Sequence, residues 1–210
     1  MSFALNQPVV NGNWSSGNLL IPYGQNVGKG DLLVMCAIGN WTSGDEISVS
    51  DSQGNLWADA VNTNFEGTQQ VTIWWASAKS SAANTITIVP AAGNTMVEAI
   101  IYDFSGFNGG AKIDQTTSPG VSGSSISANT NFAPEVCVAG FYCNGAGTGG
   151  NWNFLITDNT NLVEYTITTS SGTQTATYTG GNLGDGGALA TFYLPNTTIQ
   201  FTDAIFFGIT

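Results

Sequence analysis

The chain of 210 residues has no histidine, no arginine and only three lysines, Lys29, Lys79 and Lys112. Histidine is the commonest general acid or base in enzymes, and nucleophiles usually need a neighbouring base. Arginine and lysine neutralise phosphate groups, and the net charge of −11 repels polyanions. We therefore predict that the protein is not an enzyme, holds no cofactor and binds no nucleic acid.

Charge of either sign is also scarce, because only 8% of the residues are charged, against about 25% in typical soluble domains. Glycine, asparagine, serine and threonine take their place, which predicts a neutral, polar surface. Such a surface packs against a neighbour with few long, hydrated side chains to immobilise or desolvate. The composition favours assembly with other proteins, and it also suits a secreted adhesive protein.

Long apolar runs are missing as well, since no segment reaches the roughly 18 residues that cross a bilayer. Residues 1–8, Met-Ser-Phe-Ala-Leu-Asn-Gln-Pro, contain neither the basic nor the apolar part of a signal peptide. We expect no membrane insertion. We also expect synthesis in the cytoplasm, after which the protein either works where it was made or leaves the cell by a route such as lysis.

Three cysteines are too few for a disulfide framework. Cys36 and Cys137 lie in apolar, strand-like runs, which predicts buried, unreactive thiols. The alternative is a disulfide between Cys36 and Cys137, if their strands pair.

Short apolar runs bounded by turn residues recur along the chain, and none has the 3.6-residue period of a helix. They predict strands at residues 31–38, 46–51, 56–63, 69–78, 84–89, 96–104, 111–116, 135–142, 152–157, 162–169, 173–178, 188–194 and 198–208. This pattern indicates an all-β fold, an antiparallel, jelly-roll-like β-sandwich in a single domain of residues 1–210. Residues 1–29 would form an N-terminal arm with the first strands, and 195–210 an added C-terminal strand.

Three further features concern the organisation of the chain. Alternation in residues 71–76 places Trp74 and Trp75 on opposite faces of a strand. The segment 118–131, rich in glycine and serine, is predicted as a long surface loop within one sandwich. A faint similarity between residues 31–37 and 134–140 is too weak to establish a duplication.

Two groups of residues are candidates for binding. Asp51 and Asn55, in a turn between strands, could supply part of a calcium site, although the alternative is a hairpin whose side chains bond to their own backbone. Trp14, Trp41 and Trp152 lie among glycine, asparagine and serine, where a flat aromatic face could stack on a sugar ring or pack against another subunit. The glutamates Glu46, Glu66, Glu98, Glu135 and Glu164 occur singly, so no glycosidase pair is indicated.

Several stretches together resemble β-sandwich domains of bacterial and bacteriophage surface and virion proteins. They are residues 30–34 (Gly-Asp-Leu-Leu-Val), 49–57 (Val-Ser-Asp-Ser-Gln-Gly-Asn-Leu-Trp), 75–78 (Trp-Ala-Ser-Ala), 84–88 (Asn-Thr-Ile-Thr-Ile) and 101–106 (Ile-Tyr-Asp-Phe-Ser-Gly). The resemblance spans about residues 30–194, including residues 152–156 and 164–165. It implies a structural role on a virion and carries no catalytic residues.

The leading hypothesis is a non-enzymatic virion structural protein, a bacteriophage capsid decoration protein or another virion-surface component. Its partners would be capsid or other virion proteins, and it would form a homo-oligomer, most simply a dimer or trimer. The alternatives are a carbohydrate-binding or adhesive module that takes a glycan, and the subunit of an extracellular filament whose C-terminal strand is the donor.

Overall fold

The computed structural model describes residues 2–14, 17–40, 47–65, 69–90, 96–118, 124–143, 149–156, 161–179 and 186–195, which form antiparallel strands and no helix. The predicted all-β, sandwich-like fold is confirmed. In these ranges no helix is long and apolar enough to span a membrane.

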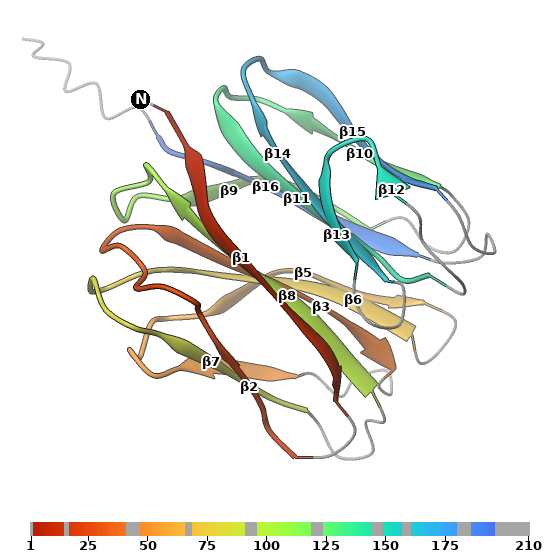
Figure 1. Ribbon diagram of the computed structural model, residues 1–210. Coiled ribbons are helices and arrows are strands. Elements are labelled where there is room, and N and C mark those ends of the chain that lie inside the picture. Colours follow the sequence, from red (N-terminus) through yellow and green to blue (C-terminus); the bar gives the residue numbers. More distant parts are fainter. Residues whose placement is uncertain are drawn as a thin grey trace, which may run out of the picture.

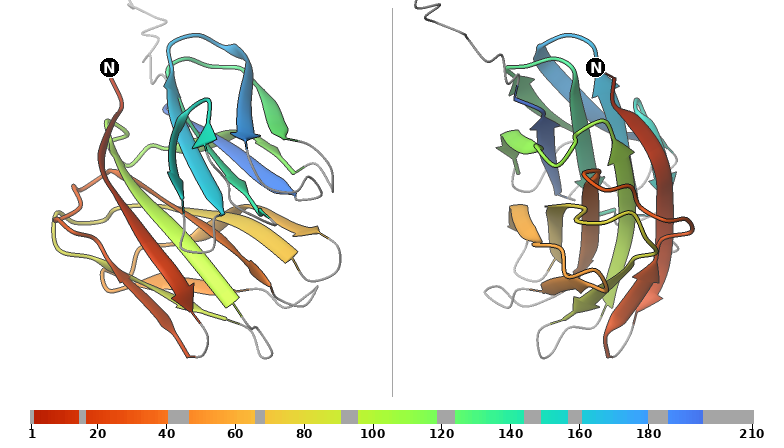
Figure 2. Two further views of the ribbon diagram at one scale, coloured as in Figure 1. Left: turned by 45° about the vertical axis from the view of Figure 1, so that its right-hand side comes forward. Right: turned by 90° about the vertical axis from the view of Figure 1, so that its left-hand side faces the viewer.

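Four sheets are stacked as layers (Figures 1 and 2). Inner sheet 1 has the order β1 (Ala4–Trp14), β8 (Met96–Ser105), β3 (Leu32–Asn40), β6 (Gln69–Ser77), β5 (Ala58–Phe65), and outer sheet 1 has β2 (Leu19–Pro22), β7 (Thr85–Val89), β4 (Ser48–Asp51). Inner sheet 2 has β13 (Asn153–Ile156), β14 (Leu162–Thr168), β11 (Glu135–Phe141), β16 (Gly187–Tyr193), β9 (Lys112–Thr117), and outer sheet 2 has β10 (Ser125–Thr130), β15 (Gly172–Thr179), β12 (Gly149–Gly150).

Three apolar cores separate these four layers. In β3, Leu32 and Val34 enter the middle core between the two inner sheets, whereas Leu33 and Met35 enter the core beneath outer sheet 1. Both faces of the strand are therefore buried, which explains its continuous apolar sequence. The middle core takes residues from both halves of the chain, so each half buries an inner sheet against the other.

The topology of β1–β8 is repeated in β9–β16. Adding eight to each strand number of inner sheet 1, β1-β8-β3-β6-β5, gives the order of inner sheet 2 read from β9 to β13. The same addition converts the order of outer sheet 1, β2-β7-β4, into that of outer sheet 2. Each half is a jelly roll of eight strands whose fifth strand has joined the inner sheet. The faint similarity between residues 31–37 and 134–140 covers the starts of β3 and β11, the equivalent central strands.

The pairing registers match the two repeats residue by residue. Leu32 pairs with Phe104 in the first repeat, and Val136 pairs with Phe192 in the second. Asp31 and Glu135 therefore occupy equivalent positions, one residue earlier. Both edge strands, β1 and β9, also carry a register shift near this point, so the irregularity is part of the repeated design.

The inner sheets pack closely where their side chains are small. Gly140 of β11 lies under Cys36 of β3, and a Cβ at Gly140 would overlap the Cys36 sulfur and lie 2.9 Å from Val71 Cγ1. Elsewhere the gap is filled by aromatic rings, with Tyr102 and Tyr165 at a centroid distance of 5.5 Å. The middle core is therefore wedge-shaped, and glycine is required at its narrow part.

One sequence prediction is corrected and two are confirmed. Segment 118–131 is not all loop, because residues 125–130 form β10. Exposed and buried positions alternate along this strand, but its residues are mostly small and polar, so the sequence shows no hydrophobic alternation. Cys36 and Cys137 are free, buried thiols on strands of different sheets. Trp74 and Trp75 do lie on opposite faces, and each packs against a core. The predicted strand at 198–208 lies outside the described residues.

Candidate functional site

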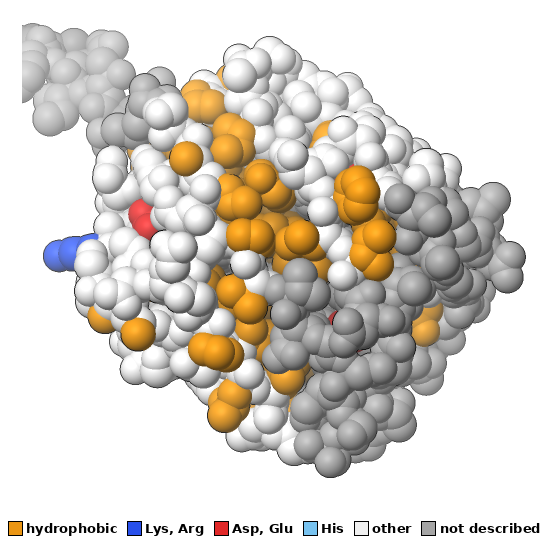
Figure 3. Space-filling view, in the orientation of Figure 1, with side chains coloured by type: hydrophobic (Ala, Val, Ile, Leu, Met, Phe, Trp, Pro, Cys, Tyr) orange, Lys and Arg blue, Asp and Glu red, His pale blue; other side chains and the backbone are white. Residues whose placement is uncertain are grey.

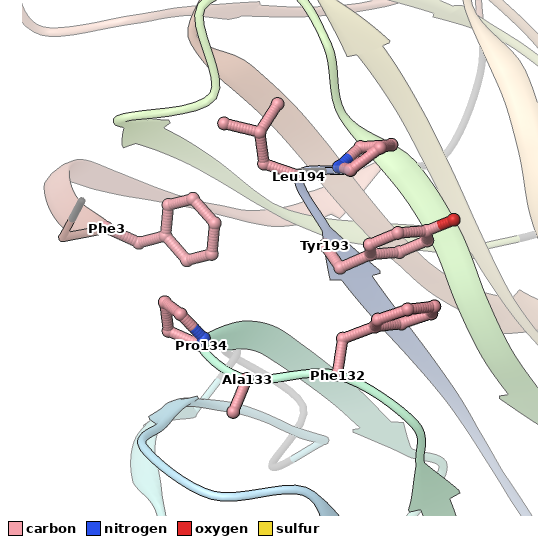
Figure 4. Close-up of a pocket in the computed structure, with 7 residues that line it drawn as sticks. Phe3, Phe132, Ala133, Pro134, Tyr193 and Leu194 are labelled. Carbon is pink, nitrogen blue, oxygen red and sulfur yellow. The ribbon is translucent and has the colours of Figure 1, made fainter. Parts of the chain in front are cut away.

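An aromatic pocket opens at the end of the inner sheets where β16 finishes. Its volume is about 340 Å³, and it is lined by Phe3, Phe132, Ala133, Pro134, Tyr193, Leu194 and Pro195 (Figure 4). A second pocket of about 350 Å³ shares Phe3, Ala133 and Pro134 with it and continues to Ile167, Thr168 and Thr169. Each volume lies at the lower end of the range for ligand sites in proteins.

Two stacked ring pairs shape the aromatic pocket. Phe132 stacks on Tyr193 with centroids 4.0 Å apart and planes 6° from parallel. Phe3 stacks on Phe107 at 4.1 Å and 2°. Phe3 is 7% exposed whereas Phe132 is 44% exposed, so one wall is fixed in the core and the other presents an open aromatic face.

A pair of acidic side chains fixes the loop that carries Phe132. Asn131 donates from its backbone N and its side chain to Asp114, at 2.7 and 2.8 Å, and the Phe132 N–H donates to Glu135 Oε1 at 2.9 Å. Asp114 and Glu135 lie close enough for each to influence the pKa of the other. Two ionised carboxylates offer only acceptors, so a hydrogen bond between them requires a proton on one of the two.

The first repeat also has an acidic pair near this end of its inner sheet, in which Asp31 corresponds to Glu135 but Asp103 corresponds to Thr191. Asp31 and Asp103 are buried near each other, and Asn6 Nδ2 donates to Asp31 Oδ2 at 3.0 Å. Gln7 Nε2 donates to Asp103 at 3.3 Å. In both repeats, therefore, polar side chains lie between the irregular edge strand and the start of the central strand, and they are more exposed in the second repeat.

Burial dominates the ionisation of these groups. It raises the pKa of Asp103 to about 7, with the nearby charge of Asp31 adding to the effect, and it raises the pKa of Glu135 to about 7. The pKa of Asp114 is instead lowered, because hydrogen bonds from Asn131 and Glu135 outweigh its burial. Of these two groups, Glu135 therefore binds a proton more readily than Asp114.

Glu164 is a third buried carboxyl group and joins inner sheet 2 to its outer sheet. It accepts hydrogen bonds from the Trp152 N–H at 3.0 Å and the Thr177 N–H at 2.8 Å. Burial raises its pKa to about 7 despite these donors. A Cβ at Gly150 would overlap the Glu164 carboxylate, so this glycine is needed for the carboxylate to reach its donors.

The structure describes the side chain of one of the three candidate tryptophans. Trp14 ends β1, and its side chain lies outside the described part of the structure, as does the whole of Trp41. Trp152 is half-buried and packs against the core beneath outer sheet 2. Of the three, only Trp152 has a described side chain, and that side chain has a packing role.

Asp51 and Asn55 lie together, with the Asn55 Nδ2 donating to Asp51 Oδ2 at 2.7 Å. Asp51 also accepts from the N–H groups of Gln53 and Asn55 and from the side chains of Trp57 and Asn84. Burial alone would raise the pKa of Asp51, but these donors lower it. The bonds favour the hairpin interpretation over calcium, because the carboxylate oxygens already serve five donors.

Sequence reasoning missed the aromatic pocket and the acidic pairs. The sequence offered two signals: the tripeptide Phe132-Ala-Pro between two strands, and single acidic residues inside apolar runs such as Ile-Tyr-Asp103-Phe. Among the described residues, no group of three or more histidine, cysteine, aspartate or glutamate side chains is placed to hold a metal ion. The described arrangement offers an apolar binding surface and buried carboxyl groups that titrate near neutral pH.

Comparison with protein-family models, with curated proteins and with solved structures found no significant match to this chain.

Proposed function

We propose that the protein is a non-enzymatic structural component of a virion surface, such as a bacteriophage capsid decoration protein, that assembles with capsid or other virion proteins and with copies of itself. The observation that carries this proposal is the uncharged, partly apolar β13 edge of inner sheet 2, beside which no further strand lies among the described residues. Such an edge offers unpaired backbone groups and apolar side chains to a partner.

The four edges of the inner sheets differ in protection against further pairing. Strand β1 contains Pro8, β5 contains Asp59 and β9 contains Lys112, and each of these strands also has a register shift. Proline, charge and bulges all hinder the addition of another strand. Strand β13, with the sequence Asn-Phe-Leu-Ile, contains no proline and no charged residue, and it pairs with β14 without a register shift.

Apolar side chains lie on both faces of inner sheet 2 near this edge, because Phe154 and Ile156 pair with residues that face outer sheet 2, whereas Tyr165 and Ile167 face the middle core. Phe154 and Ile156 of β13 are 41% and 37% exposed. Leu5, Tyr165 and Ile167 lie partly buried on β1 and β14 at the open side of the middle core. Figure 3 shows apolar side chains gathered over this part of the molecule. Grouped apolar surface of this kind marks interaction sites more often than scattered single residues do.

The scarcity of charge supports the same role. A partner that covers this face meets few ionic groups whose desolvation would oppose binding. The net charge of −11 still requires a basic partner, bound cations or spacing between copies. Synthesis in the host cytoplasm and release by lysis are compatible with the free thiols of Cys36 and Cys137.

Co-sedimentation with particles purified from the producing cells tests this proposal. The variant Phe154→Lys/Ile156→Lys places two charges on the β13 edge and should lower the particle-bound fraction by about tenfold or more, which corresponds to roughly 1.4 kcal/mol of lost affinity. The control Leu20→Lys changes a side chain that is 59% exposed on outer sheet 1 and should bind like the wild type. Wild-type protein that remains in the supernatant would contradict the proposal, and equal binding by both variants would exclude the β13 edge.

A further inference from the structure

We propose that the aromatic pocket is the docking site of the chain's own C-terminal segment, residues 196–210. This inference does not rest on a virion role. It assigns an occupant to an apolar site at the end of inner sheet 2.

The path of the chain leads directly to the pocket. Leu194 and Pro195, the last described residues, line it themselves (Figure 4). Residues 196–198 are Asn-Thr-Thr, and the first large apolar residue of the segment is Ile199. Three residues span at most about 10 Å, which is enough to turn back across a pocket that begins at Pro195.

The apolar pattern of the segment matches the two adjoining pockets. In an extended strand Ile199 and Phe201 project to the same side, with Gln200 and Thr202 on the other. The aromatic pocket offers the open face of Phe132, and the second pocket continues past Pro134 to Ile167. Two apolar side chains two residues apart thus meet two apolar cavities that share a wall.

Charge is compatible with this arrangement. Asp203 is the only charged side chain in residues 196–210. Lys112, one of three lysines in the chain, has an exposed side chain. In the strand register its backbone lies opposite that of Tyr193, which lines the pocket. Residues directly paired across two strands project to the same face, so a cation lies on the side where the segment would pass.

The segment of the same chain is favoured over that of a second copy by covalent attachment. A short tether gives an effective concentration in the millimolar range, far above the usual concentration of free protein. Exchange between copies would produce a swapped oligomer instead.

Photocrosslinking of the full chain tests the proposal. Phe132 is replaced by p-benzoylphenylalanine, an aromatic residue that suits its 44% exposed position. After irradiation of dilute protein, mass spectrometry should find adducts to residues 196–210 within single chains, about tenfold more than with the same residue in place of Leu20, as high effective concentration predicts. Adding Phe201→Asp should reduce the yield about tenfold, because the pocket would have to bury a charge.

Three results would overturn the inference. Adducts only between chains, with a yield that falls on dilution, would show that a second copy is the occupant. Adducts from position 132 that omit residues 196–210 would show that the pocket does not hold the segment. An unchanged yield with Phe201→Asp would show that the contact does not depend on the apolar side chain.

Discussion

The buried carboxyl groups predict that the protein is more stable in mild acid than at alkaline pH. Asp103, Glu135 and Glu164 have ordinary pKa values of 3.8, 4.5 and 4.5, and burial raises each to about 7 in the folded chain. A carboxyl group with a raised pKa stabilises the fold fully below the unfolded value, and this contribution disappears as pH rises through the folded value. The sensitive window is therefore about pH 4 to 7.5.

The size of the effect follows from the same numbers. At pH 5 each carboxyl is protonated in the folded chain, two units below its pKa of about 7, and largely ionised when unfolded. This difference corresponds to roughly 2.7 kcal/mol per group before solvent screening. Because water reaches part of the surroundings of each group, we expect about 1 kcal/mol per group. Raising the pH from 5 to 8.5 should then lower the Tm by roughly 6–12 °C, at about 2–4 °C per kcal/mol for a chain of this size.

Thermal unfolding at constant ionic strength measures this effect. In the variant Asp103→Asn/Glu135→Gln/Glu164→Gln the amides resemble protonated carboxyl groups and do not titrate, so most of the pH dependence between 5 and 8.5 should disappear. The control Asp51→Asn removes an acid whose pKa is lowered, so it should keep the wild-type pH slope. A wild-type Tm that is constant or rises from pH 5 to 8.5 would refute this argument, as would an unchanged slope in the triple variant.

Three other predictions concern the cores and the Asp51 turn. Gly140→Ala should lower the free energy of unfolding in urea by about 1–3 kcal/mol, because the added Cβ would overlap Cys36. The control is Gly24→Ala, whose Cβ would meet only Gln7 Oε1 at 3.7 Å. Equal destabilisation by the two substitutions would contradict the close approach of the inner sheets at Gly140. Asp51→Ala removes an acceptor of five hydrogen bonds and should cost about 2–4 kcal/mol, with addition of calcium leaving the wild-type Tm unchanged; a calcium-dependent rise would restore the metal hypothesis. Cys36, Cys137 and Cys143 are buried, so a thiol reagent should label none of them in the native protein and all three in urea, and rapid native labelling would contradict their burial.

Much of the fold could be predicted because each strand carries its own local signal. The central strand β3 reads as a continuous apolar run with turn residues at its ends, and β6 alternates between two faces. Strand β10 was missed because Ser-Ile-Ser-Ala-Asn-Thr buries only small or polar residues besides Ile126. Hydrophobic periodicity cannot identify a strand whose buried side is itself small and polar.

The duplication and the pocket depend on long-range pairing, which composition does not reveal. Asp31 and Glu135 are equivalent because of strand register, although their neighbouring sequences differ. The aromatic pocket joins Phe3, Phe132 and Tyr193 from three distant parts of the chain. Only the three-dimensional path brings these residues together, so no spacing in the sequence indicated the site.

Immunogold electron microscopy of particles from the native source is the most direct test of a virion-surface role. Antibodies against the folded chain should label intact particles at regular surface positions, and the protein should be found in the particle fraction. A protein found only as a soluble monomer, with unlabelled particles, would contradict that role.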